Sequence, residues 1–374
     1  MAQNKPATPA TPRRRLSWND PFTRGIIYQV LILGVLGFCV WYLVSNTLHN
    51  LAVRNISTGF DFLHREAGFA IGESDLAYSP SDSYGRAILV GLVNTLKVAV
   101  IGIIAATVFG TLLGIARLSK NWLVSRLAGA YVEVMRNVPL LLQLFFWYAL
   151  ITETLPGPRQ ALNPMSGVFL SNRGLKLPTL QGDAMDWIFV GLGIAVVLWV
   201  LMAHWARRRL ERTGVPFPTL RVGVLLLFLI PALALFISPT PLALDLPRLQ
   251  GFNFVGGVTV SPEFAALLAG LITYTSAFVA EVVRSGIQSV GKGQWEAAQA
   301  LGLSRARMMR LVVLPQALRV IVPPMTSQYL NLTKNSSLAV AIGYPDIVSV
   351  VNTTLNQTGQ EIEGILIIMA AYLT

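Results

Sequence analysis

Residues 291–305 read Gly-Lys-Gly-Gln-Trp-Glu-Ala-Ala-Gln-Ala-Leu-Gly-Leu-Ser-Arg, and an apolar run lies on each side of them, at 263–283 and 317–343. Each run reaches about 20 residues or more, the length that an α-helix needs to cross the hydrocarbon core of a bilayer. The quoted stretch is therefore a loop between two membrane-spanning helices. It predicts a polytopic helical membrane protein whose loop has a structure of its own.

This loop predicts two short helices. The first covers about Gln294 to Leu301, with Glu296 in its first turn, where a carboxylate suits the helix dipole. Gly302 follows as the left-handed stop of that helix. Ser304 can then cap a second helix, which continues to a break at Pro315.

A helix of this length must dock on something, because isolated helices shorter than about 12 to 15 residues are marginal in water. Trp295, Ala298 and Leu301 follow one another at three-residue spacing and predict one docking face. Small alanine side chains beside them allow close approach. On physical grounds two readings stay open, a groove in a partner protein and a surface helix lying in the lipid headgroups.

The overall composition supports a membrane protein. The chain has 374 residues, of which 53% are apolar and 13% charged, and its mean hydropathy is +0.58. This is too apolar for a water-exposed surface. The net charge of +11 raises nucleic-acid binding as an alternative. The basic residues, however, precede the first apolar run or cluster between particular runs, as the positive-inside rule predicts, so we expect a lipid bilayer and no nucleic acid as partner.

The expected fold class is an all-α polytopic membrane protein with about eight transmembrane helices. With the basic amino terminus in the cytoplasm, the connections 117–126, 207–221 and 284–316 carry the Lys and Arg clusters on the cytoplasmic side. The opposite loops are richer in Pro, Gly, Ser and Asp. The eight segments are 26–48, 87–117, 127–151, 187–206, 221–238, 263–283, 317–343 and 359–374.

The loop also carries a family resemblance. Its pattern resembles the EAA loop of permeases from binding-protein-dependent ABC importers, with Val312 where the pattern has Ile. Two further segments, 136–141 and 331–338, are similar to the polar-amino-acid branch of that family. The resemblance covers roughly 87–150 and 263–374. The residues that match the EAA pattern are Glu296, Ala297, Ala298, Gly302, Leu314 and Pro315.

This resemblance implies a type I ABC importer transmembrane domain over 87–374, with its EAA coupling loop at about 284–316. The segment of about 152–262, with two extra spans, is an extended insertion similar to general L-amino-acid permeases of the AapQ or BztB kind. Before the domain we expect a disordered cytoplasmic tail at 1–25. Residues 26–86 are expected to form a first transmembrane helix and a periplasmic loop.

The resemblance further implies a permease subunit of an ATP-driven amino-acid importer in the bacterial inner membrane, which forms half of the translocation pathway. The expected partners are a second permease in a heterodimer, a homodimeric ABC ATPase and a periplasmic amino-acid-binding protein. Residues Glu296 to Gly302 would contact the ATPase. No cofactor is expected on this chain, and ATP and Mg would be used by the partner ATPase.

Residues 286–293 nearly spell a phosphate-binding loop, but the sequence departs from the motif. Gly293 lacks the hydroxyl that ligates magnesium, and the segment follows a membrane helix where the motif requires a strand. We therefore do not expect an enzyme. The alternative function is a secondary amino-acid transporter or channel independent of ATP. Internal repeats and carboxylate relays, which such transporters usually have, are not evident.

Charged residues at membrane depth are functional candidates. Glu281 could pair with the ammonium group of an amino acid, or with Arg284 three residues later. Lys334, followed by Asn335, could face a substrate carboxylate, or else snorkel or form hydrogen bonds within the bundle. Lys97 is expected to pack or snorkel.

A second candidate segment is Arg136-Asn137 with Pro139, expected near the cytoplasmic end of the third span. Pro139 should kink that helix, which makes a hinge or gate plausible. The alternative is a helix-start turn anchored by Arg136. Both residues are predicted to belong to the substrate pathway.

Overall fold

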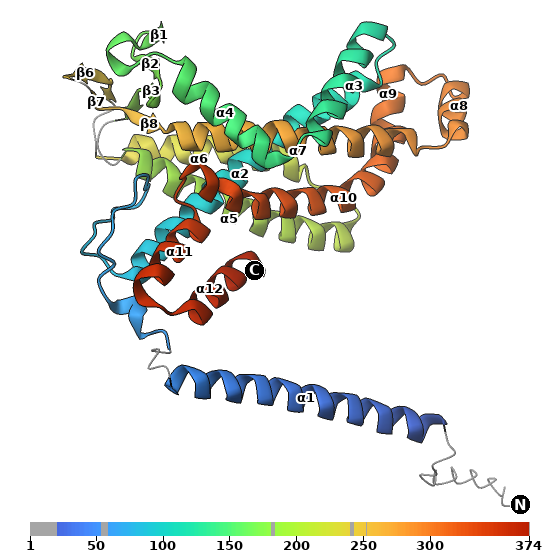
Figure 1. Cartoon of the computed structure of the whole chain (residues 1–374). Coiled ribbons are helices and arrows are strands. Elements are labelled where there is room, and N and C mark those ends of the chain that lie inside the picture. Colours follow the sequence, from blue (N-terminus) through green and yellow to red (C-terminus); the bar gives the residue numbers. More distant parts are fainter. Residues whose placement is uncertain (1–20, 54–58, 181–183, 240–242, 252, 374) are drawn as a thin grey trace, which may run out of the picture.

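A computed structural model describes residues 21–53, 59–180, 184–239, 243–251 and 253–373 (Figure 1). Most of it is helical. The helices are α1 (Pro21–Val53), α2 (Tyr84–Arg117), α3 (Trp122–Asn137), α4 (Leu140–Thr154), α5 (Ala184–Thr213), α6 (Thr219–Ile237), α7 (Pro262–Gln288), α8 (Lys292–Ala300), α9 (Arg305–Met308), α10 (Leu314–Asn335), α11 (Ile347–Thr358) and α12 (Glu361–Leu373).

Six helical segments of the described chain are long and apolar enough to cross a membrane, and a bent pair can form a seventh span. The seven correspond to the first seven predicted segments. At the eighth, the structure has the 13-residue helix α12. Of the expected tail at 1–25, residues 1–20 lie outside the described residues and 21–25 belong to α1.

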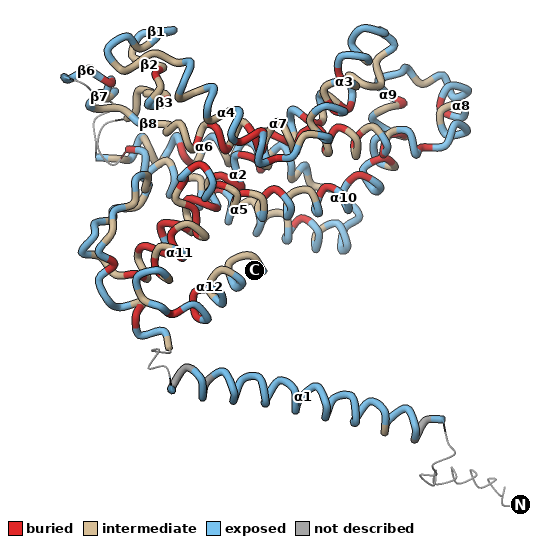
Figure 2. The backbone as a smooth tube through the Cα atoms, viewed as in Figure 1, coloured by how far each residue is buried: buried red, intermediate tan, exposed pale blue. Residues whose placement is uncertain are grey.

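The parallel helices α2 and α7 form the centre of the bundle and contact each other almost backbone to backbone. A Cβ atom added at Gly110 would lie 2.5 Å from the Cβ atom of Val279, and one at Gly114 would lie 2.8 Å from the carbonyl oxygen of Ala280. Small residues allow membrane helices to approach in this way. Figure 2 shows that the buried residues concentrate here and in the neighbouring helices, while nearly all of the described side chains of α1 are exposed.

Helices α3 and α4 are the two arms of the bent pair, and they meet at 105°. Val138 has extended backbone, because the residue before a proline disfavours the helical conformation. Pro139 follows it and directly precedes α4. The carbonyl groups freed at the break find a partner in Gln143, whose amide nitrogen donates to Met135 and Val138 at 3.0 Å each. The kink predicted at Pro139 is confirmed.

The insertion contains two spans, as expected, and also strands that the all-α prediction missed. Helices α5 and α6 pair with each other. One sheet has the order β1-β2-β3-β8, and two-stranded sheets join β4 to β5 and β6 to β7. The strands are β1 (Leu162–Met165), β2 (Val168–Ser171), β3 (Gly174–Leu177), β4 (Thr179–Leu180), β5 (Leu244–Asp245), β6 (Arg248–Gln250), β7 (Asn253–Val255) and β8 (Val258–Val260).

The strands lie at one end of the bundle, where α7 begins, and α8 and α9 lie at the other end, where α7 finishes (Figure 1). We call these the strand end and the loop end. The segment 59–83, which precedes α2, packs at the strand end through buried Phe62 and Ala67. Helix α11 packs beside it on the first turns of α2, at Ala87 and Ile88. The bundle thus has two chemically different ends.

Candidate functional site

The short helix of the loop, α8, begins at Lys292 and ends at Ala300, close to the predicted bounds. Gly302 has φ of +69°, and its amide donates to the carbonyl of Gln299 at 2.9 Å. The amide of Leu303 reaches back to Ala298 at 3.2 Å, which completes a Schellman cap. The predicted left-handed stop is confirmed. Glu296 lies in the second turn and not in the first, because α8 starts two residues earlier than expected.

The docking face predicted for α8 is wrong. Ala298 is 2% exposed and packs, together with Trp295, into a core built from α7, α9 and α10 of the same chain. Leu301, the third member of that predicted face, is 79% exposed. The helix instead turns a row of small and acidic side chains outward, formed by Glu296, Ala297 and Ala300. Three-residue spacing shows which side chains of a helix are neighbours. It does not show which face of the helix is buried by the rest of the same chain.

The second helix of the loop also differs from the prediction. Ser304 precedes α9 with extended backbone, but its side chain makes no capping hydrogen bond. The chain then passes through a π-helical turn, Met309–Val313, directly into α10, so there is no break at Pro315. The wider turn accommodates the proline ring, and Pro315 lies in the first turn of α10, where no amide hydrogen is needed.

The loop borders a groove that leads toward the middle of the bundle. Its volume is about 1200 Å³, and its walls come from α2, α7, α8 and α10. Lys120, Trp295 and Arg305 line it at the loop end. Deeper in, Thr107 donates to the hydroxyl oxygen of Tyr329 at 3.0 Å. A displacement of α8 therefore changes the shape of this groove directly.

Glu281 binds two arginines. Its carboxylate forms ion pairs with Arg117, the last residue of α2, and with Arg284 one turn further along α7. Glu281 lies inside α7, which continues to Gln288. Both carboxylate oxygens have partners within this chain, which favours the alternative of a structural pair with Arg284. The predicted contact of Glu281 with a substrate ammonium group stays a prediction.

The position expected for Arg136 and Asn137 near the cytoplasmic end of the span is corrected by the structure. Both precede the break between α3 and α4, which lies beside the middle of α7. The guanidinium carbon of Arg136 is 5.2 Å from the ring centroid of Phe278, and one turn earlier the hydroxyl of Tyr131 donates to Thr273 at 2.9 Å. Arg136 and Asn137 are exposed. The break at Pro139 therefore places both residues beside the middle of α7.

Lys334 and Asn335 close α10 at a similar depth. Leu332, in the same turn, packs on the backbone of Gly102 in the middle of α2. Lys334 is exposed and forms no ion pair with any described residue. Asn335 marks the change from α10 to the 3-10 segment Ser336–Ile342. The structure thus brings two cations from α3 and α10 to the central zone of the bundle.

Lys97 differs from these two cations. Its ammonium group lies 3.3 Å from Glu73 and 3.0 Å from Asp75, both in the segment 59–83, and 4.7 Å from the ring of Phe264. The expected packing or snorkelling role therefore takes the form of ion pairs at the strand end. These pairs were not found from the sequence, because the two carboxylates are more than twenty residues away in the chain.

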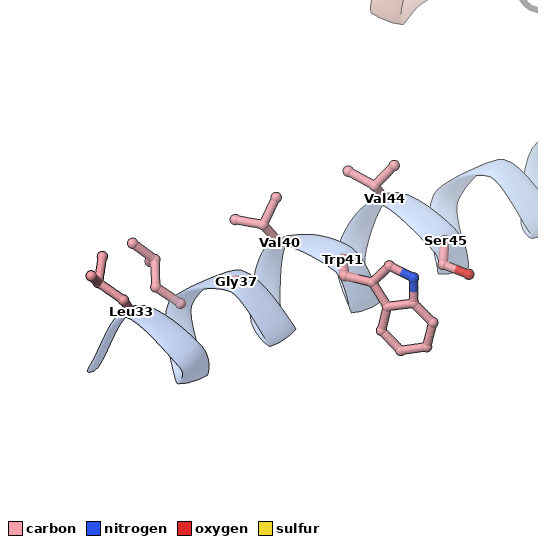
Figure 3. Close-up of a pocket in the computed structure, with 7 residues that line it drawn as sticks. Leu33, Gly37, Val40, Trp41, Val44 and Ser45 are labelled. Carbon is pink, nitrogen blue, oxygen red and sulfur yellow. The ribbon is translucent and has the colours of Figure 1, made fainter. Parts of the chain in front are cut away.

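The apolar hollow along α1 has no features of a functional site. Its lining residues, from Leu33 to Ser45, all come from one face of a single helix, as Figure 3 shows. Ser45 is the only hydroxyl among them, and the surface as a whole suits lipid chains.

Comparisons with known proteins show which family the chain belongs to. A family model described as the binding-protein-dependent transport system inner membrane component matches residues 98–374. The chain is 47% identical to the general L-amino acid transport system permease protein AapQ of Rhizobium johnstonii, across 98% of this chain and 94% of that protein. It is 41% identical to the glutamate/glutamine/aspartate/asparagine transport system permease protein BztB of Rhodobacter capsulatus, across 95% and 91%.

A solved amino acid ABC transporter with histidines is similar at 22% identity and a TM-score of 0.44, over 78% of this chain and 87% of that one. The family match covers α3 and α4, the loop of residues 292–315 and both Arg136 and Lys334. This chain therefore belongs to the family of inner membrane components of binding-protein-dependent transport systems.

Proposed function

We propose that this chain is the permease subunit of an ATP-driven amino-acid importer and lines one half of its translocation pathway. The observation that carries the proposal is the loop of residues 292–315, which is packed against the membrane helices on one face and open on the other. Its inner face touches the groove between α2, α7 and α10. Force applied to the outer face of α8 is therefore transmitted to the pathway helices through packed side chains.

The outer face of α8 is the proposed contact with the ATPase. Glu296, Ala297 and Ala300 are exposed, and Leu301 extends the same surface with an apolar side chain. Small residues let a partner approach the helix closely, while Leu301 supplies apolar area to bury. ATP and Mg would be bound and used by that partner, a homodimeric ABC ATPase.

The proposal includes two further partners. A single chain encloses only half of a pathway, so a second permease is needed, and we propose a heterodimer. A periplasmic amino-acid-binding protein would deliver the substrate at the strand end. In this arrangement the loop end and the amino terminus of α1 face the cytoplasm. In support, the arginine-rich α5–α6 turn also lies at the loop end, as the positive-inside rule requires.

Arg136 and Lys334 are the proposed substrate contacts. An unpaired cation at membrane depth is costly unless it meets an anion, and every amino acid carries a carboxylate. A planar guanidinium binds a carboxylate through two parallel hydrogen bonds, and its cation–π contact with Phe278 orients it for this. Relatives such as BztB are named for amino acids with acidic or amide side chains.

The experiment that tests the proposal is assembly with a candidate ATPase, followed by uptake in liposomes. Gly302→Asp forces a side chain into a backbone with φ of +69°, so we expect loss of ATPase binding and of ATP-dependent uptake. Gly291→Asp is the matched control, since Gly291 precedes α8 with φ of −56° and no atom would crowd its Cβ. Amino-acid uptake that persisted without any ATPase would refute the proposal.

A further inference from the structure

The turn between α5 and α6 concentrates positive charge. Five arginines lie within fifteen residues of sequence, and the only carboxylate among them is Glu211. We call these five residues the arginine cluster. None of them forms an ion pair with a described residue, and four are exposed. The cluster consists of Arg207, Arg208, Arg209, Arg212 and Arg221.

The length of α5 places this cluster in the headgroup layer. The helix has 30 residues, which is about 45 Å, whereas the hydrocarbon core of a bilayer is about 30 Å thick. Its apolar part finishes at Trp205, and the arginines start two residues later. The ring centroids of Trp205 and Phe217 lie 5.4 Å apart in an edge-to-face contact. Tryptophan is enriched at membrane–water interfaces, so Trp205 marks the interface at this end of α5.

One member of the cluster is held in position by these rings. The guanidinium carbon of Arg209 lies 5.3 Å from the centroid of Trp205 and 5.9 Å from that of Phe217. Arg208 and Arg212 are one turn apart on α5, and like charges at this spacing repel each other. An anion between them would remove that repulsion, and the one carboxylate of the turn, Glu211, forms no ion pair with any described residue.

The rest of the hairpin explains which anion is available. Helices α5 and α6 interlock closely, since Gly223 accommodates the Trp199 ring and Gly191 the backbone of Pro231. Beyond this pairing, the strongest contact of either helix with the described chain is the one between α5 and β4, at the strand end. The outer faces of both helices are exposed and apolar, with Phe189, Val200 and Phe228 all more than 60% exposed. Lipid therefore surrounds the hairpin at the loop end.

We propose that the arginine cluster binds the phosphate headgroup of an anionic phospholipid, which fastens the loop end of the α5–α6 hairpin in the membrane. Guanidinium groups bind phosphate through forked hydrogen bonds, and basic clusters next to membrane helices favour anionic lipids. The insertion thus contains a lipid site at its loop end. An acidic surface of a partner protein is the competing occupant, and the test separates the two.

The test compares the whole transporter complex carrying wild-type chain with Arg208→Gln/Arg212→Gln. Both are purified from the same membranes, and phosphatidylglycerol and cardiolipin retained by the complex are counted by native mass spectrometry. We expect retention to fall by on the order of tenfold or more when two arginines are removed. In nanodiscs, phosphatidylglycerol should raise the unfolding temperature of wild type above its value in phosphatidylcholine, and this gain should shrink in the variant.

Two controls make the result specific. Arg173→Gln/Arg248→Gln removes two exposed arginines at the strand end and should leave lipid retention unchanged. Arg208→Lys/Arg212→Lys keeps both positive charges but lacks the forked guanidinium group. It should therefore retain more anionic lipid than the Gln variant and less than wild type. Equal retention by wild type and the Gln variant would overturn the proposal, and so would full restoration by lysine. Loss of the ATPase or second permease with unchanged lipid would assign the cluster to a protein partner.

Discussion

Arg117 and Glu281 form an ion pair that joins the end of α2 to α7, close to the loop that the ATPase is proposed to contact. Close contacts at Gly110 and Gly114, one turn apart, precede it along the same seam. The pair therefore belongs to a rigid two-helix unit. Glu281 also binds Arg284, so its carboxylate is the common acceptor of two guanidinium groups.

The first prediction concerns this carboxylate. Glu281→Gln leaves two part-buried arginines without their anion, so we expect a loss of about 1–3 kcal/mol in the free energy of unfolding and reduced uptake. Thermal unfolding of the purified complex measures the first effect. Adding Arg117→Gln should recover part of the loss, because the unpaired cation is then gone. A raised KM with wild-type stability would instead support contact between Glu281 and the substrate.

The second prediction concerns Arg136. Arg136→Gln should raise the KM for amino-acid uptake by roughly ten-fold or more, since a charge-assisted hydrogen bond contributes about 1.5–3 kcal/mol. Arg136→Lys should recover only part of the affinity, because lysine lacks the planar fork. Arg126→Gln, on the same helix at the loop end and also exposed, is the control. An unchanged KM in Arg136→Gln would return Arg136 to an anchoring role.

The third prediction separates the two faces of α8. Ala297→Asp places a charge on the outer face, so ATPase binding should be lost while the permease keeps its unfolding temperature. Ala298→Leu overpacks the core shared with Trp295 and should cost the permease about 1–3 kcal/mol of stability. Co-purification and thermal unfolding, measured side by side, check both. The opposite pattern would mean that the inner face meets the ATPase.

The fourth prediction concerns the seam between α2 and α7. Gly110→Ala would bring a methyl group within 2.5 Å of Val279, so the helices must separate, and we expect lower stability and lower transport. Gly129→Ala, in α3 with no atom within 4 Å of the added methyl, should be neutral or slightly stabilising. Equal stability of the two variants would contradict the prediction, because it would mean that α2 and α7 can separate without a loss in the free energy of unfolding.

The fifth prediction is a pH dependence at the strand end. Asp346 is fully buried ahead of α11, and burial raises its pKa to about 7, against the lowering effect of backbone hydrogen bonds from Ser349 and Val348. One carboxylate oxygen accepts from Ser349 at 2.8 Å, while the other has no hydrogen-bond partner among the described residues. The folded state therefore holds a proton that the unfolded state releases near pH 4.

The sign of this effect follows from proton linkage. Between about pH 4 and 7 the folded state binds more protons than the unfolded state, so the contribution of Asp346 to stability falls as the pH rises through this window. Asp346→Asn keeps the helix cap and cannot ionise, so its unfolding temperature should depend less on pH there. An identical pH profile for wild type and Asp346→Asn would contradict the prediction.

The membrane helices could be predicted because their signal is local. Each apolar run is long enough to span a bilayer, and Gly302 and Pro139 mark a stop and a kink through their own backbone preferences. The short strands of the insertion were missed, although glycines with positive φ such as Gly167 and Gly174 mark two of their turns. Strands of two to four residues carry too little alternation to be recognised among long apolar helices.

By itself, the sequence determined that this is a helical membrane protein, where its spans lie and which loop resembles a coupling motif, because length, hydropathy and spacing are properties of neighbouring residues. Only the tertiary structure decided which face of α8 is free, that Glu281 is held by Arg117 and that Arg136 lies beside Phe278 in the middle of α7. These depend on contacts between helices distant in sequence, and the packing of one helix against another determines which side chains remain free for a substrate or a partner.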